Sequence, residues 1–171
     1  MRILVIRHAI AEDRRAFAQS GREDGLRPLT RLGRRRMRRA ARGLRRVAPA
    51  IDLLACSPLT RAAQTAEIVA RAYHGVKVTR VAGLSPNKPS AALLQWLKER
   101  PARSTVAVVG HEPHLGLFVS WMLTGLQESF VSLKKGAACM LDCGPEVKAG
   151  RASLLWSLKP AHLRALGRRG R

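Results

Sequence analysis

Short apolar runs alternate along the chain with longer segments in which apolar residues recur every three or four positions. An apolar run without polar alternation is typical of a parallel strand that is buried on both faces. The runs that predict strands cover residues 1–6, 51–55, 77–82, the weakest of the four, and 105–109. The longer segments between these runs predict helices, so strand and helix alternate along the chain.

The helical segments carry recognisable end signals. Thr30 can cap a helix that Pro49 ends, with arginines on the faces outside its apolar stripe. Ser57 and Pro58 form a cap and first-turn pair for a helix that runs to about Tyr73. Further helices are expected over residues 91–98 and 114–123 and directly after Pro160.

The C-terminal part of the chain predicts a hairpin. Residues 137–142 and 152–158 flank a Gly-Pro turn, which is the pattern of two antiparallel strands. With the preceding alternation, this predicts a three-layer α/β/α sandwich with a mainly parallel central sheet and an antiparallel hairpin at one edge. Residues 9–28 are polar and predict a long loop over the sheet edge. We expect a single domain over residues 1–171 that ends in a frayed basic tail at about residues 167–171.

Composition bounds the class of protein. The 171 residues are 46% hydrophobic and 25% charged, which fits a globular chain with a real core. Thirty-two Lys and Arg against eleven Asp and Glu give a formal net charge of +21. Such a charge attracts polyanions and acidic partners but does not define a reaction. The excess of arginine is also what the coding bias of a GC-rich genome produces.

Cysteine spacing and hydropathy bear on the compartment. The three cysteines form neither a CxxC pair nor a Cys/His cluster at zinc spacing, so we expect a reducing, cytoplasmic setting. The apolar run at the N-terminus is too short for a signal peptide. No apolar stretch approaches the roughly 20 residues that a membrane-spanning helix needs, so no membrane association is expected.

Three groups of polar residues directly follow predicted strands. In an open α/β sheet, the ligand crevice lies outside the carboxyl ends of the strands. The groups are Arg7-His8, the stretch from Ser57 to Arg61, and Gly110-His111-Glu112. Guanidinium groups donate paired hydrogen bonds to phosphate oxygens, and an imidazole can serve as a nucleophile. Two arginines and two histidines at one edge therefore predict a phosphate site.

Each of these residues also has an ordinary structural alternative. His8 could bond a backbone carbonyl at the strand end, and Arg61 could be a solvated arginine. Against this, Arg7 at the end of a buried strand needs an anionic partner, and a cation in a first helical turn is mildly unfavourable. The free backbone N–H groups after His111 favour an anion, so we expect the backbone of Glu112 to contribute to binding. The coincidence of all these features favours the phosphate site.

Together with further stretches, these residues resemble the histidine phosphatase superfamily, and in particular its SixA-type phosphohistidine phosphatase branch. The signature of the superfamily is an Arg-His-Gly near the start, where this chain has Arg7-His8-Ala9. The supporting stretches span nearly the whole chain. They are residues 7–13, 27–30 with Gly33, 57–66, 84–86 and 110–115.

The resemblance implies a two-step phosphoryl transfer through a phosphohistidine enzyme intermediate, without a metal or another cofactor. It implies that His8 attacks phosphorus as a neutral imidazole, and that water then hydrolyses phospho-His8. The residues implied to hold the three equatorial oxygens are Arg7, Arg61 and His111. Positioning and fixed positive charge are the main contributions to such a transfer. The other ring nitrogen of His8 then needs an acceptor such as a carbonyl.

One position departs from many members of the superfamily. These carry an acidic proton donor just before a Leu after the third strand, and that position is Gly83 here. A positioned acid contributes about 10²- to 10⁴-fold when the leaving group is a poor one such as an alkoxide. A phosphoramidate leaves as imidazole and needs less help, so the missing acid favours phosphohistidine over phosphomonoesters. Glu12, Asp13 or Glu112 could substitute, but we expect Glu12 and Asp13 to be solvated loop charges.

The other basic residues are interpreted more simply. Residues 31–46 contain nine arginines and predict a charged, solvated helix that packs by one face. The alternatives are docking to an acidic protein or loose, unspecific binding to nucleic acid, for which the seven aromatic residues offer no stacking platform. Lys134 and Lys135 are either rim contacts for a phosphoprotein or loop charges. His114 is expected to cap its helix rather than to face the pocket.

The sequence therefore predicts a monomeric, cytoplasmic phosphatase that removes phosphate from phosphohistidine of a phosphotransfer protein. A phosphatase of a small phosphorylated metabolite or nucleotide is the enzymatic alternative, and a non-catalytic polyanion-binding protein is the other. The change His8→Ala separates these classes. It abolishes turnover in an enzyme but barely affects a charge-driven binder, whose affinity instead falls steeply with salt.

Overall fold

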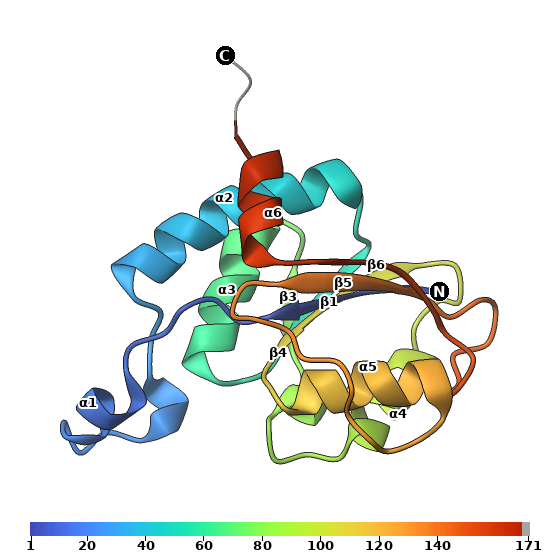
Figure 1. The fold of residues 1–171 in the computed structure, drawn as a ribbon, viewed down its shortest axis with the longest axis horizontal. Coiled ribbons are helices and arrows are strands. Elements are labelled where there is room, and N and C mark those ends of the chain that lie inside the picture. The colour runs from blue at the N-terminus through green and yellow to red at the C-terminus, as the bar shows by residue number, and fades with distance from the viewer. Residues whose placement is uncertain (169–171) are drawn as a thin grey trace.

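A mixed six-stranded sheet forms the centre of the protein in a computed structural model that describes residues 1–168 (Figure 1). Its strands are β1 (Arg2–Arg7), β2 (Leu53–Cys56), β3 (Val78–Arg80), β4 (Thr105–Gly110), β5 (Ala138–Asp142) and β6 (Ser153–Leu158). The strand order is β3-β2-β4-β1-β5-β6. The first four strands are parallel to one another, whereas β5 and β6 pair antiparallel. This confirms the mainly parallel sheet with an antiparallel hairpin at one edge.

Helices cover both faces of the sheet. They are α1 (Arg14–Ala18), α2 (Arg31–Val47), α3 (Thr60–Ala72), α4 (Ser90–Lys98), α5 (His114–Thr124) and α6 (Pro160–Leu166), with two short 3-10 helices, η1 (Asp24–Leu26) and η2 (Ala82–Leu84). Helices α2, α3 and α6 lie on one face and α4 and α5 on the other (Figure 1), which confirms the three layers. No helix within residues 1–168 is long and apolar enough to cross a membrane.

The central strands bury both of their faces. In β1, Leu4 and Ile6 pack in the core beneath α2 and α3, whereas Ile3 and Val5 pack in the core that contains Phe118 of α5. These side chains are fully buried, and each contributes roughly 1.5–3 kcal/mol to folding by leaving water. Because both faces are buried, the run has no polar alternation. The same burial fixes the orientation of the strand and so the position of Arg7 at its end.

The segment of residues 9–28 is more ordered than the predicted loop. It contains α1 and η1, and Ala11 forms an isolated antiparallel bridge with Leu29. Asp13 caps α1, because its carboxylate accepts hydrogen bonds from the backbone N–H groups of Arg15 and Ala16. Phe17 is buried and anchors the short helix. Local capping and one buried aromatic side chain therefore order a segment that looks polar in the sequence.

The predicted start of α3 at Ser57 and Pro58 is wrong. The helix begins at Thr60, and its N-cap is Leu59, which makes no side-chain capping bond. Ser57 still follows the line of the sheet, because its backbone N–H donates to the carbonyl of Val109 at 2.9 Å. One further bond to β4 delays the turn into the helix.

Helices α2 and α6 pack unusually closely through two glycines. A Cβ atom at Gly43 would overlap the carbonyl oxygen of Leu163, and one at Gly167 would overlap that of Arg39. Gly167 is also the C-cap of α6, so it is packed rather than frayed as the sequence predicted. The rest of the predicted basic tail, residues 169–171, lies outside the described residues.

Candidate active site

The parallel pairing of β1 with β4 brings two histidines together at the carboxyl end of the sheet. Arg7 pairs with Gly110, and the backbone N–H of His8 donates to the Gly110 carbonyl at 3.0 Å. His111, which follows β4, therefore lies beside His8. The two ring centroids are 5.0 Å apart, and only 5% of His8 and 2% of His111 are exposed.

Arg61 reaches the same place from α3. Strand β2 lies on the other side of β4, so α3 starts at the same edge of the sheet, and Arg61 in its first turn is 3% exposed. The cavity at this edge has a volume of about 430 Å³. It is lined by Arg7, His8, Ala11, Glu12, Asp13, Arg14, Arg27, Arg61, Pro86, His111, Glu112 and Lys135. All five residues predicted for the phosphate site are among them.

The acceptor that orients His8 is the carbonyl of Ala9. The Nδ1 atom of His8 lies 2.7 Å from that oxygen. A carbonyl only accepts, so Nδ1 carries the hydrogen and Nε2 carries the lone pair. Thr65 fixes this peptide to α3, because its hydroxyl oxygen accepts from the Ala9 N–H and its hydroxyl donates to the Arg61 carbonyl. The backbone beside His8 is thereby tied to the helix that carries Arg61.

Several buried nitrogen atoms around His8 have no hydrogen-bond partner among residues 1–168. They are Nε of Arg7, Nε of Arg61 and both ring nitrogens of His111. An unsatisfied buried polar group costs about 1–3 kcal/mol, so such groups are rarely left without a role. A tetrahedral oxyanion offers several acceptor oxygens within one small volume, and this is the ligand that such a set of nitrogens fits.

Burial keeps both histidines neutral. It lowers the pKa of His8 from 6.5 to about 4, against the hydrogen bond to Ala9 and with the help of the positive charges of Arg61 and Arg7. The pKa of His111 falls to about 2, mainly through burial and then through His8 and Arg61. Burial also lowers the pKa of both arginines, but a guanidinium group stays charged at neutral pH. The positive charge of the pocket therefore comes from its cationic side chains and not from its imidazoles.

Asp24 holds Arg61 in place. The Arg61 Nη1 donates to the Asp24 backbone carbonyl at 2.9 Å, and Nη2 lies 3.1 Å from the Asp24 carboxylate. The same carboxylate accepts from Nε of Arg27 at 2.8 Å and lies 3.4 Å from Arg14. Its partial burial opposes ionisation, but the hydrogen bond from Arg27 and the neighbouring positive charges lower the pKa of Asp24 overall. Asp24 is therefore ionised at neutral pH and orients two of the pocket arginines.

Arg7 is held from the other side by a loop before β5. Its Nη1 donates to the carbonyl of Leu133 at 2.6 Å, and the Leu133 N–H donates to the Glu112 carboxylate at 2.9 Å. The backbone N–H of Gly136 donates to the carbonyls of Arg7 and His8. The side chain of Glu112 thus positions this loop, a role distinct from the backbone contact that the sequence predicted.

The carboxylates of the pocket rim differ in how free they are. Glu12 and Asp13 are exposed, as expected, yet both line the pocket. Asp13 caps α1 and Glu112 holds Leu133, which leaves Glu12 as the carboxylate without such a structural task. Gly83 is not among the residues that line the pocket, and a Cβ atom there would lie 3.1 Å from backbone atoms of α4.

His114 does not cap α5, contrary to the prediction. The N-cap is Pro113, and the His114 ring is 3% exposed. The ring lines a neighbouring cavity of about 240 Å³ together with Trp121 and Pro86, and Pro86 also lines the pocket of His8.

The pocket offers no evident metal site. Within residues 1–168, no three His, Cys, Asp or Glu side chains gather as metal ligands would. The three cysteines are free and buried, and none lines the pocket. Burial is also the main cause that raises the pKa of each thiol. Metal independence stays a prediction, which is tested below.

Sequence reasoning missed the residues that hold the arginines. Asp24 lies in the segment of residues 9–28 that was predicted as a polar loop, and Arg27 lies in a stretch that entered only through the family resemblance. Leu133 acts through its backbone, so its residue type carries no signal. The sequence left open whether Lys135 contacts a substrate at the pocket rim or is a loop charge, and the structure shows that Lys135 lines the pocket. The one available signal for Asp24 was its place in a long charged segment of the kind that often carries function.

Comparisons with known proteins agree with this fold. The family model of the histidine phosphatase superfamily (branch 1) matches residues 3–85. An uncharacterized protein of Picosynechococcus sp. is 36% identical over 146 residues, which cover 84% of this chain and 86% of that protein. The family match confirms the resemblance to this superfamily that was noted in the sequence. The chain belongs to the histidine phosphatase superfamily.

Two solved structures define the type of fold more closely. The structure of the protein histidine phosphatase SixA complexed with tungstate has a TM-score of 0.81 and 23% identity, covering 95% of this chain and 99% of that chain. A phosphoserine phosphatase from Entamoeba histolytica in complex with phosphoserine has a TM-score of 0.65 and 17% identity, covering 95% of this chain and 98% of that chain. The fold of this protein is of the SixA type.

The contact between Asp24 and Arg61 predicts the effect of Asp24→Asn. The change removes the charge that orients Arg61 but keeps the backbone carbonyl, so we expect kcat/KM to fall by about 10- to 100-fold through misplacement. The free energy of unfolding should change by less than about 1 kcal/mol, because the carboxylate is partly exposed. Steady-state kinetics and thermal unfolding measure both. The exposed neighbour Glu23 provides the control, and an equal loss of activity in Glu23→Gln would contradict the assignment.

The lowered pKa of His8 predicts an unusual pH dependence. The ring loses its proton as the pH rises through about 4, so His8 is neutral from about pH 5 upward. In the unfolded chain an ordinary histidine binds its proton at pH 6.5, so the fold loses stability as the pH falls from 6.5 towards 4. An NMR titration of the imidazole signals, assigned with His8→Ala, should place the His8 midpoint near pH 4. A midpoint near 6.5 would refute this environment.

Proposed function

We propose that this protein is a metal-independent phosphatase that works through a phosphohistidine intermediate on His8. The observation that carries the proposal is that a neutral histidine lies beside buried nitrogen atoms that have no hydrogen-bond partner in residues 1–168. The lone pair of His8 Nε2 lies in the pocket where Arg7, Arg61 and His111 present buried nitrogen atoms without partners in residues 1–168. A positioned nucleophile among fixed donors is the arrangement that phosphoryl transfer requires.

The reaction takes two displacements. In the first, the lone pair of His8 Nε2 forms a bond to phosphorus, and the bond between phosphorus and the leaving group breaks with its electron pair on the leaving group. In the second, the oxygen of a water molecule attacks phospho-His8. The bond between phosphorus and Nε2 then breaks, inorganic phosphate leaves, and the lone pair returns to Nε2. Protons from water balance the leaving group and the phosphate.

The other residues supply charge and position. Arg7 and Arg61 neutralise the phosphoryl oxygens, and a neutral His111 adds one N–H donor without adding charge. The backbone of Glu112 lies at the entrance to α5 and provides a further donor towards the same oxygens. Because Asp24 and Leu133 already orient the two arginines, little reorganisation is needed when the transition state forms.

Phosphohistidine of a phosphotransfer protein is the substrate that we propose. Two observations support it: the similarity of the fold to the protein histidine phosphatase SixA, and a glycine at position 83, where the resemblance to the superfamily leads us to expect a proton donor. An imidazole leaving group needs less protonation than an alkoxide. The similarity to a phosphoserine phosphatase supports the alternative, a small phosphorylated metabolite.

Three free buried cysteines suit a reducing, cytoplasmic setting.

The test compares phosphate release from three substrates. They are a histidine-phosphorylated phosphotransfer protein, a phosphoserine peptide and p-nitrophenyl phosphate. Wild type and His8→Ala are assayed in parallel, without added metal and with a chelator. We expect wild type to release phosphate fastest from phosphohistidine, His8→Ala to be inactive, and the chelator to have no effect.

Each other outcome removes a different part of the proposal. Faster phosphate release from the monoesters would support the phosphatase activity but refute phosphohistidine as its preferred substrate. Loss of activity with the chelator would refute metal independence. If wild type released no phosphate from any of the three, binding without catalysis would take the place of the enzyme, and its affinity would be expected to fall steeply with salt.

A further inference from the structure

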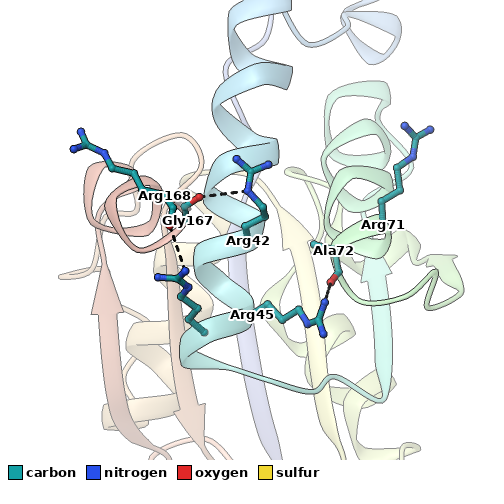
Figure 2. Close-up of a pocket in the computed structure, with 7 residues that line it drawn as sticks. Arg42, Arg45, Arg71, Ala72, Gly167 and Arg168 are labelled. Carbon is teal, nitrogen blue, oxygen red and sulfur yellow. Dashed lines mark hydrogen bonds between the residues drawn. The ribbon is translucent and has the colours of Figure 1, made fainter. Parts of the chain in front are cut away.

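A second cavity, of about 470 Å³, lies at the end of the molecule opposite the candidate active site. It is formed by the C-terminal ends of α2, α3 and α6 (Figure 2). The ends of α2 and α3 lead into β2 and β3, so the cavity lies at the amino ends of the parallel strands. The pocket of His8 lies at their carboxyl ends. The two cavities are therefore separate sites.

Five arginines line this cavity, which we call the arginine groove. They are Arg42, Arg45, Arg46, Arg71 and Arg168, and the remaining lining residues are Ala72 and Gly167. Among residues 1–168, none of the five has a carboxylate within 4.0 Å, and the ion pairs of the protein involve other arginines. Five charged guanidinium groups thus share one groove with no carboxylate of residues 1–168 at ion-pair distance.

Backbone carbonyls hold three of these side chains in position. Nε of Arg42 donates to the carbonyl of Gly167, and Nη1 of Arg45 donates to that of Ala72, each at 3.3 Å (Figure 2). Arg46 donates in the same way to the carbonyl of Arg168 at 3.3 Å. Each bond uses one of the five N–H groups of a guanidinium, so most donors stay available.

The helix ends explain part of this arrangement but not all of it. A helix C-terminus carries about half a negative charge and stabilises nearby cations. The partial negative charges of three helix ends are much smaller than the positive charge of five arginines, so a clear excess of positive charge remains. Arg71 and Arg168 also donate no side-chain hydrogen bond within residues 1–168, so capping does not account for them.

The helices α2 and α6 that form the groove pack closely against each other. Gly43 lets the backbone of α2 approach the carbonyl of Leu163, and Gly167 lets α6 approach the carbonyl of Arg39. This close packing brings Arg168 next to the arginines of α2. The site is therefore built by tertiary structure and is not a property of the arginine-rich helix alone.

We propose that the arginine groove binds an extended chain of phosphates. Figure 2 shows its guanidinium groups spread from α6 across α2 to α3, whereas a single phosphate would need them to converge. Arginine forks match phosphate oxygens, and a phosphate chain brings one charge with every link. No aromatic side chain lines the groove, so the contacts are to phosphates and not to stacked bases.

The experiment measures the binding of two phosphate chains at several salt concentrations. The probes are a linear inorganic polyphosphate and a single-stranded oligonucleotide, which separate a bare phosphate chain from a nucleic-acid backbone. Polyglutamate serves as a polyanion without phosphate. Two double variants each remove two of the five guanidinium charges from the groove. They are Arg45→Gln with Arg46→Gln, and Arg71→Gln with Arg168→Gln. The second variant removes no side-chain hydrogen bond. The matched control is Arg31→Gln with Arg35→Gln, which removes the same charge from exposed positions at the other end of α2. Arg61→Ala reports on the active site.

We expect both groove variants to weaken binding of at least one probe, while the control and Arg61→Ala keep it within about twofold. For the oligonucleotide, the slope of log K against log salt should become shallower by about 1.4, since each contact to a single strand contributes about 0.7. An equal loss of binding in the control variant would mean that net charge alone explains the effect, and it would overturn the proposal. Loss in Arg61→Ala alone, no binding of either probe, or tighter binding of polyglutamate than of both phosphate chains would also overturn it.

Discussion

Strand β1 lies between β4 and β5, and its parallel register with β4 pairs Arg7 with Gly110. The positions of Arg7, His8 and His111 in the candidate active site follow from this pairing. It sets the rings of His8 and His111 side by side and points Arg7 towards the loop before β5. Burial on both faces enforces the register, because a slip of one residue would turn each apolar side chain of β1 to the opposite core. Folding and the geometry of His8 therefore depend on the same contacts.

The pocket separates charge from nucleophilicity. Burial keeps His8 and His111 neutral, so one can attack and the other can donate a hydrogen bond, while the arginines provide positive charge. Two neutral or anionic groups hold those arginines, the carbonyl of Leu133 for Arg7 and Asp24 for Arg61. Such prior orientation is the main way in which a protein accelerates phosphoryl transfer. The arginine groove repeats the principle at the other end of the sheet, where backbone carbonyls position unpaired guanidinium groups.

Local pattern was sufficient for the strands, for the layers and for the neighbourhood of His8, His111 and Arg61. Apolar runs identify buried strands, and the carboxyl ends of parallel strands meet at one edge. The pattern failed where tertiary contacts decide. Asp24 lies 37 residues from Arg61, and Leu133 lies 126 residues from Arg7 and contributes only its carbonyl. Ser57 was misplaced because one extra sheet bond delays α3. No periodicity in the sequence encodes such contacts.

The central claim is that His8 carries the phosphoryl group between the two displacements. The most direct measurement is rapid acid-free quenching of the protein during turnover of a labelled phosphohistidine substrate, followed by mapping of the label by mass spectrometry. The account predicts a transient label on the peptide that contains His8, with the acid lability and base stability of a phosphoramidate, and none in His8→Ala. A label on another residue, or full turnover by His8→Ala, would contradict it.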